Sequence, residues 1–232
     1  MKSFKPNLIP NNPKDGSFDM DKVIMQNGGY EKYIITLKKD GVRVQLIDGK
    51  VLSRSLEVPN SKLVLERFSN LAEKLKELGI AVDAEFYMHG QKFNSIFRFF
   101  AKSDVTTEKY RAELEKAYSK NEVKFKKDYD GLTIDFLTKF HDDLQIHIFD
   151  GFLTDTPEIQ GYEKRIKEIQ KRIIESGAWN NIHFRFQSQF EAIDKEDLER
   201  LYSLALEKGY EGLVLTHKDH KYKFGRNTLK EG

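Results

Sequence analysis

The sequence predicts an α+β fold in which antiparallel sheets are flanked by helices. Strand-like and helix-like patterns intermix along the chain without a regular βαβ repeat, which disfavours a doubly wound parallel sheet. Two Asp-Gly pairs, at 40–41 and 48–49, separate runs of alternating apolar residues, and this is the sequence pattern of a β-hairpin. With 232 residues, 39% of them hydrophobic, the chain is long enough to bury a sizeable core. We expect one domain over residues 1–232.

The first part of the chain is expected to be an extended lead-in followed by a three-stranded meander. Residues 1–29 are rich in Pro, Asn, Asp and Gly, which disfavours a long helix. Strands are then predicted at 33–37, 42–47 and 50–55, joined by turns at the two Asp-Gly pairs. In the second strand, alternation places Arg43 on the face opposite to the apolar residues.

The periodicity of apolar residues predicts the remaining elements. Helices are expected at 61–79, at 92–104, from Pro157 onward with Thr156 as N-cap, and from Asp194 to Lys208, with a charged helix or loop at 106–120. Strands are expected at 80–87, 132–137, 144–149 and 183–186, and a last hairpin at 212–215 and 221–224. Apolar residues spaced by three and four in the helix after Pro157 indicate packing against a sheet.

The composition excludes several classes of protein and site. Basic residues number 39 and acidic residues 37, so a nucleic-acid partner would need a local basic face rather than an overall positive field. Cysteine is absent, which excludes disulfides and thiolate metal sites. No apolar run approaches the roughly 20 residues of a membrane span, and the N-terminus lacks the apolar core of a signal peptide. We expect an intracellular monomer with no membrane partner.

The six residues from Lys38 to Arg43 carry the strongest chemical signal, in the pattern K-x-D-G-x-R. At average composition, four specified positions in six arise by chance roughly once in tens of thousands of windows. A lysine that attacks phosphorus must be neutral, so its pKa of about 10.4 must fall or a proton acceptor must be near. The neighbouring cations Lys39, Arg43 and Arg54 would lower it. Taken alone, the Lys-Lys-Asp-Gly tetrapeptide is equally typical of a solvated turn.

Four further segments follow in a defined order: Ser53-Arg54-Ser55, Asp83-Ala84-Glu85-Phe86, Gln145 to Asp150, and Tyr210-Glu211-Gly212-Leu213-Val214-Leu215. Each alone has an ordinary interpretation, such as a strand Glu facing water or one core Phe among 17. Together with K-x-D-G-x-R they resemble the motifs of the covalent nucleotidyltransferases, which comprise ATP-dependent DNA ligases, RNA ligases and mRNA capping enzymes. The resemblance covers about residues 5 to 232 and implies a ligase adenylation fold with a nucleotide pocket between its sheets. Ala84 stands where the family usually has Gly.

The resemblance implies a role for each residue that matches a motif. Lys38 would be the nucleophile that takes AMP from ATP as a covalent lysyl-AMP. Phe149 would stack on the adenine, since an aromatic ring binds any base through its π face. Carboxylate oxygens suit Mg²⁺, and Asp40 and Glu211 would hold it or its waters. The remaining nucleotide contacts would come from Arg43, from Arg54 at the ribose or phosphates, from Glu85 at the sugar, and from Arg226 at a phosphate or the nucleic acid.

The implied partner is nicked duplex DNA, whose 5′-phosphate would receive the AMP, in the cytoplasm of a bacterium or a virus-infected host cell. The family's last motif, an apolar pair followed by Lys-x-Lys, and its OB-fold domain are not recognised before Gly232. Lys221-Tyr222-Lys223 has a similar form but precedes Arg226, and we interpret it as a hairpin strand. We therefore expect weak or absent self-adenylation and little nick sealing by the isolated chain. Three alternatives stay open: an RNA ligase, a GTP-using capping enzyme, and a non-catalytic fragment that only binds nucleotide or nicked DNA.

Overall fold

The computed structural model describes residues 19–91, 93, 96–97, 100, 107–129, 131–135, 137–138, 144–156, 161–178 and 183–222. Its helices are α1 (Met20–Gln26), the 3-10 helix η1 (Tyr30–Lys32), α2 (Lys62–Glu77), α4 (Thr107–Lys120), α5 (Glu122–Asp128), α7 (Tyr162–Glu175) and α8 (Lys195–Glu207). Its strands are β1 (Tyr33–Lys38), β2 (Val42–Ile47), β3 (Lys50–Ser53), β4 (Ile80–Tyr87), β5 (Gln145–Leu153), β6 (Phe184–Phe186), β7 (Gln189–Phe190) and β8 (Gly212–His217).

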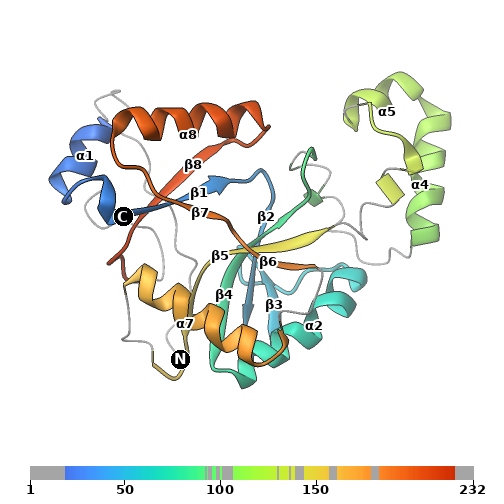
Figure 1. The fold of residues 1–232 in the computed structure, drawn as a ribbon. Helices are drawn as coiled ribbons and strands as arrows, with labels where there is room; N and C mark the ends of the chain where they lie inside the picture. The colour runs from blue at the N-terminus through green and yellow to red at the C-terminus, as the bar shows by residue number, and fades with distance from the viewer. Residues whose placement is uncertain are drawn as a thin grey trace.

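Two β-sheets form the centre of the molecule. The smaller has the strand order β7-β1-β8, and the larger has the order β3-β2-β4-β5-β6. All pairings are antiparallel except that of β5 with β6. Figure 1 shows α8 and α1 beside the smaller sheet, α2 and α7 along the larger, and α4 with α5 standing apart from both. The expected α+β fold is confirmed.

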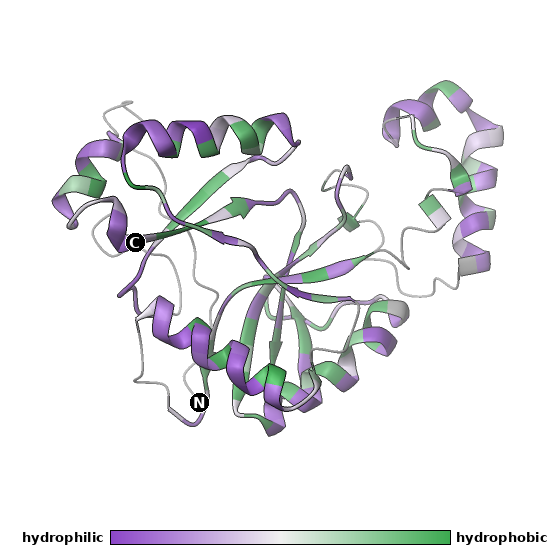
Figure 2. Ribbon diagram, viewed as in Figure 1, coloured by the Kyte–Doolittle hydropathy of each residue, from purple (hydrophilic) through white to green (hydrophobic). Residues whose placement is uncertain are grey.

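The larger sheet has one apolar and one polar face because its strands alternate with a period of two. The apolar face packs against α2 and α7, and Val44, Phe68, Phe86, Ile146 and Ile169 are completely buried there. Hydrophobic residues accordingly concentrate on the strands and on the inner faces of the two helices (Figure 2). The polar face carries the charged residues of β2, β4 and β5, and three of the predicted site residues, Arg43, Glu85 and Phe149, lie on these strands.

The smaller sheet has its own core, formed with α1 and α8. Tyr33 and Ile35 of β1 pack there with Ile24 of α1, next to Leu213 and Leu215 of β8. Helix α7 contacts both sheets. Its Ile169 belongs to the core of the larger sheet, whereas Tyr162 and Ile166 pack on Ile34 of β1 in a separate small cluster. This helix therefore ties the two sheets together.

The Asp40-Gly41 pair does not form the predicted hairpin. β1 pairs with β7 and β8, while β2 pairs with β3 and β4, so the chain passes from one sheet to the other between them. Gly41 is needed here for close approach, because a Cβ atom on it would lie 2.2 Å from the carbonyl oxygen of Phe86. The second pair does form its hairpin between β2 and β3: Asp48 and Gly49 have φ values of 51° and 75°, as a tight two-residue turn requires.

Three other predictions are wrong. Residues 134–135 and 137–138 are helical instead of forming a strand at 132–137, because their apolar side chains pack with those of α4 and α5 in a separate small core. Helix α7 begins at Tyr162 with Gly161 as N-cap, so Thr156 is not its N-cap, and Pro157 lies outside the described residues. The described residues of the predicted last hairpin do not pair with each other: β8 pairs with β1, Lys221 forms a bridge with Gly161, and residues 223–224 lie outside the described part.

Most remaining elements are confirmed. Ser61 caps α2 through a 3.4 Å bond from the Val64 amide, and Asp194 caps α8 through a 2.8 Å bond from the Asp197 amide. The strand predicted at 80–87 is β4, and those at 144–149 and 183–186 are β5 and β6. At 92–104, the described residues 93, 96–97 and 100 are helical, and at 106–120 the charged segment forms α4. The lead-in before residue 19 lies outside the described residues, and α1 was not expected.

Across the described residues, every helix is too short or too polar to traverse a lipid bilayer.

Candidate active site

Lys38 and Glu211 lie side by side although they are 173 residues apart in sequence. Lys38 ends β1, its antiparallel partner in β8 is Gly212, and the Glu211 amide donates a 3.0 Å hydrogen bond to the Lys38 carbonyl. The Lys38 ammonium contacts the Glu211 carboxylate, and the two side chains are 45% and 40% exposed. Gly212 has φ +144°, which favours glycine. The structure thus brings together two predicted residues at a solvent-accessible position.

Arg43 and Glu85 are opposite each other on β2 and β4, with Asp83 two residues before Glu85 on the same face. The Arg43 guanidinium binds the Asp83 carboxylate, with Nε donating to Oδ1 at 2.8 Å and a second contact to Oδ2. Asp83 is fully buried and also accepts a 2.9 Å bond from the Tyr222 hydroxyl. Sequence reasoning missed Asp83 and Tyr222 as site residues. The alternation of Asp83 with Glu85 was the available signal for the first.

The Glu85 carboxyl has an unusual acidity. Burial raises its pKa to about 8, and the Asp83 and Glu211 carboxylates raise it too, while Arg43 and Lys38 oppose the shift. Glu85 is therefore largely protonated at neutral pH and can donate a hydrogen bond as well as accept one. A protonated carboxyl is suited to binding a hydroxyl group such as those of a ribose.

Phe149 lies next to this charged cluster on β5. Its ring is partly exposed, and the Arg43 guanidinium carbon is 5.2 Å from the ring centroid, a distance typical of a cation–π contact. The Tyr162 hydroxyl donates a 2.9 Å hydrogen bond to the Phe149 carbonyl, which holds this part of β5 against α7. Five predicted residues therefore meet in a single region, although they come from four strands and from the position just before β8. They are Lys38, Arg43, Glu85, Phe149 and Glu211.

A buried ion pair supports that region, and sequence reasoning missed it. Arg165 of α7 is completely buried and donates three hydrogen bonds of 2.8–3.0 Å to the Asp150 carboxylate and one of 3.0 Å to the His220 carbonyl. Burial raises the pKa of Asp150, and the Arg165 guanidinium opposes that shift. The pair fixes the segment that leads into Tyr222, and hence the hydroxyl that reaches Asp83. An arginine inside the apolar stripe of α7 was the sequence signal.

The other predicted residues are less closely associated. Asp40 accepts a 3.2 Å hydrogen bond from the Phe93 amide, and Arg54 is exposed in the turn after β3. Arg226 lies outside the described residues. Within the described part of the chain, no group of three or more Asp, Glu or His side chains could hold a metal ion. Mg²⁺ commonly uses only one or two carboxylates together with water and phosphate oxygens, so Asp40 and Glu211 fit its donor chemistry.

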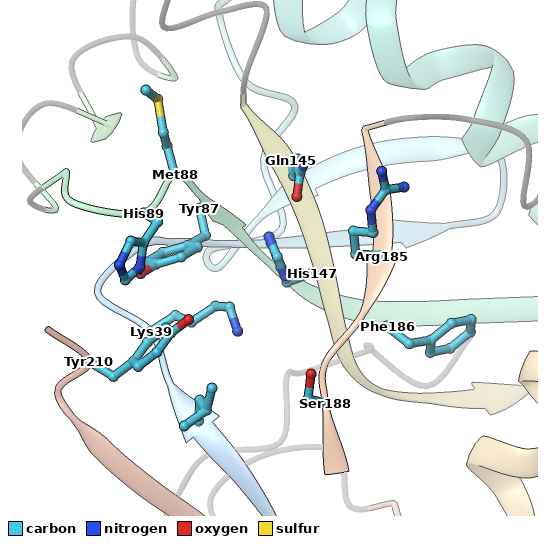
Figure 3. Close-up of a pocket in the computed structure, with 11 residues that line it drawn as sticks. Lys39, Tyr87, Met88, His89, Gln145, His147, Arg185, Phe186, Ser188 and Tyr210 are labelled. Carbon is cyan, nitrogen blue, oxygen red and sulfur yellow. The ribbon is translucent and has the colours of Figure 1, made fainter. Parts of the chain in front are cut away.

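A cavity of about 570 Å³ lies beside this region, and its lining includes Lys39 and Tyr210, the immediate neighbours of Lys38 and Glu211. In Figure 3 the Lys39 amine points into this space between the Tyr210 and Tyr87 rings on one side and His147 on the other. Its nitrogen is 5.3 Å from the Tyr87 centroid and 5.4 Å from that of Tyr210. Burial lowers the pKa of Lys39 to about 8, against the opposing charge of Glu85.

A family model shows the family of the chain, and solved structures show a similar fold. The model of the ATP dependent DNA ligase domain matches residues 17–230. Two solved structures with a similar fold are the Chlorella virus DNA ligase-adenylate (21% identity, TM-score 0.59, covering 98% of this chain and 66% of that one) and the ATP-dependent DNA ligase of bacteriophage T7 in complex with ATP (19% identity, TM-score 0.60, covering 97% and 66%). The chain thus spans just under two thirds of either structure. The search of curated proteins finds no match.

Proposed function

This chain belongs to the ATP-dependent DNA ligase domain family, and from that premise we propose that it takes AMP from ATP onto Lys38 and passes it to the 5′-phosphate of a nick in duplex DNA. The observation that carries the proposal is the position of Lys38, which contacts Glu211 beside the cluster of Arg43, Glu85 and Phe149. We propose that the chain is one adenylation domain, which the packing of α7 on both sheets supports, and that it acts as a monomer.

In the first step the Lys38 Nζ atom attacks the α-phosphorus of ATP. An N–P bond forms as the P–O bond to pyrophosphate breaks. The ammonium must first lose one proton to become a nucleophile, and the second proton leaves after the N–P bond has formed. Glu211 forms an ion pair with this ammonium, and an ammonium nitrogen has no free lone pair with which to attack. The pair must therefore separate, or the proton must pass to Glu211, before attack.

The neighbouring side chains would bind the nucleotide. Phe149 offers a ring for the adenine, the protonated Glu85 carboxyl can bind a ribose hydroxyl, and Arg43 supplies positive charge for a phosphate. Arg54 and Arg226 are proposed to contact phosphates or the nucleic acid. A divalent cation such as Mg²⁺, with Glu211 and Asp40 among its ligands, would neutralise the charge of the phosphates when bound.

The second and third steps transfer AMP to the 5′-phosphate and then join the strands. The phosphoramidate bond at Lys38 breaks as the 5′-phosphate oxygen attacks the AMP phosphorus. The 3′-hydroxyl next attacks the activated 5′-phosphate, the new phosphodiester bond forms, and AMP leaves. DNA as the substrate rests on the family to which the chain belongs. A nick with an RNA strand, and GTP in place of ATP, are the comparison substrates that separate this proposal from an RNA ligase and a capping enzyme.

The proposal is tested by detecting the covalent AMP adduct on the protein. The 232-residue chain is incubated with ATP and Mg²⁺, and intact-protein mass spectrometry followed by peptide mapping locates the AMP. We expect weak but detectable modification on Lys38, none in Lys38→Ala, and the same weak modification in Lys39→Gln. The Lys39→Gln variant is informative because burial lowers the pKa of Lys39 to about 8, and on acidity alone this makes Lys39 the rival nucleophile. An unmodified wild type, or equal modification of Lys38→Ala, would rule the proposed reaction out for this chain.

A further inference from the structure

We propose that the cavity bordered by Lys39, His147 and Arg185 is a second anion site, separate from the nucleotide site at Lys38, which takes a nucleoside phosphate. Its walls come from the end of β1, the end of β4, the start of β5, and β6, with Ser188 and Tyr210 closing it. Neither Lys38 nor Glu211 lines it. The inference does not require that Lys38 is the nucleophile.

The charge of the lining selects an anion. Of the described residues around the cavity, Lys39 and Arg185 are cations, His89 and His147 are imidazoles, and no carboxylate is present. The nearby Glu85 carboxylate, which acts on Lys39, has its own pKa raised to about 8 and so is mostly uncharged at neutral pH. Positive charge in a concave, partly buried site focuses the field on a bound phosphate.

A second acidic residue lies near the cavity but does not line it. The charge of Asp40 acts on the Tyr87 hydroxyl, and its carboxylate accepts a hydrogen bond from the Phe93 amide. His147 is neutral, because burial lowers its pKa to about 3 and the charges of Lys39 and Arg185 add to the shift. It can therefore present one N–H donor or one acceptor to a ligand.

The shape and the aromatic walls select a nucleoside as the group that carries the phosphate. The Tyr87 and Tyr210 rings are nearly parallel, with centroids 6.2 Å apart and an interplanar angle of 27°, and the His147 ring meets Tyr87 edge-on at 5.5 Å. Figure 3 shows Arg185 across the cavity from this aromatic side. A volume of about 570 Å³ lies within the range of sites for small ligands, and flat rings suit a base.

The position of Lys39 gives an independent reason for an anionic ligand. Its nitrogen lies 5.3 Å and 5.4 Å from the centroids of the Tyr87 and Tyr210 rings, which stabilise a cation only partly. A bound phosphate would give this amine a charge-assisted hydrogen bond. The nucleoside phosphate has two sources, a free nucleotide or the end of a nucleic-acid strand, and both present the same group.

Binding to the Lys38→Ala protein, in which no lysyl-AMP forms at that position, tests the site. The nucleotide site is first saturated with adenosine, which lacks the phosphate that the cavity is proposed to bind. Calorimetric titrations then use AMP, a 5′-phosphorylated trinucleotide and inorganic phosphate as probes. We expect AMP, the trinucleotide or both to bind more tightly than inorganic phosphate. Added Lys39→Gln or Arg185→Gln should weaken that binding roughly tenfold or more, as loss of one charge-assisted hydrogen bond predicts.

Two controls keep the result interpretable. Lys171→Gln removes an exposed cation of α7 and should leave the affinity unchanged, and Lys39→Arg keeps the charge and should retain binding. Tight binding of AMP alone identifies a free nucleotide, and tight binding of the trinucleotide alone identifies a strand end. Equal binding of inorganic phosphate and AMP, no binding with the nucleotide site saturated, or unchanged affinity in folded Lys39→Gln and Arg185→Gln overturns the inference. Adduct formation on Lys38 is measured separately, so failure of either idea leaves the other standing.

Discussion

Replacing Arg165 with Met would test whether the buried ion pair holds the site region together. The Arg165 and Asp150 side chains are 1% and 7% exposed, and the guanidinium supplies three hydrogen bonds to the carboxylate and a fourth to the His220 carbonyl. Methionine has a similar length but no donor. The substitution would therefore leave the Asp150 carboxylate buried without its cation, and removal of one partner of such a pair costs about 3–5 kcal/mol.

The loss of unfolding free energy in Arg165→Met has an upper limit that depends on pH, because Asp150 can take up a proton instead of staying charged. From an ordinary pKa of 3.8, protonation costs about 1.36 kcal/mol for each pH unit above that value, which is about 4.4 kcal/mol at pH 7 and about 1.6 kcal/mol at pH 5. In the variant the folded-state pKa of Asp150 lies above its unfolded value, so the folded protein holds the extra proton and stability falls as pH rises. The loss relative to wild type should thus be largest at pH 7.

Urea unfolding of wild type and Arg165→Met at pH 5, 6 and 7 measures this difference. The double variant Arg165→Met/Asp150→Asn is the matched control, because an uncharged amide cannot titrate at this position, and the difference in stability between the two variants should be larger at pH 7 than at pH 5. A deficit at pH 7 below about 1 kcal/mol, or one that is the same at pH 5 and pH 7, would refute the account of a buried charge left without a partner.

Three further predictions concern single side chains. Gly41→Ala should destabilise the fold by about 2 kcal/mol or more in urea unfolding, since its Cβ would meet the Phe86 carbonyl; a neutral effect would contradict the close approach. Phe149→Leu should weaken ATP binding about tenfold in calorimetry if the ring stacks on the base, and an unchanged affinity would exclude stacking. The folded-state pKa of His147 is about 3, against an ordinary value of 6.5, so the protein loses stability as the pH falls through this window. His147→Gln should therefore make the loss between pH 7 and pH 5 smaller by about 2 kcal/mol, and equal losses would show that His147 is not buried as a neutral group.

The sequence predicted the candidate site residues better than it predicted the contacts that position them. Lys38, Glu85, Phe149 and Glu211 stand in short motifs, and the period of strands places the middle two on one face. The pairing of Arg43 with Asp83 depends on two strands that are 40 residues apart. Such contacts leave no local signal, because each residue is ordinary in its own segment.

The errors in the predicted fold also come from contacts between segments that are far apart in the sequence. Asp-Gly is a local hairpin signal, but the partner of β1 is β8, far along the chain, and glycine at 41 serves contact with β4 rather than a turn. The apolar run at 132–137 was too short to distinguish a strand from a helix by periodicity. Its helical conformation is set by packing with α4 and α5. Tertiary contacts decided both cases.

The passage of the chain between the two sheets at Gly41 has a consequence for biosynthesis. Strands β2 to β6 lie between residues 42 and 186, so the larger sheet can assemble while the rest is still being made. Lys38 must wait for Glu211, 173 residues later, which at a synthesis rate of about 5–20 residues per second is a delay of roughly 10–35 s. A nascent chain interrupted before β8 would carry the lysine without its carboxylate partner. Synthesis of β8, rather than appearance of Lys38, therefore times the onset of any chemistry proposed at Lys38.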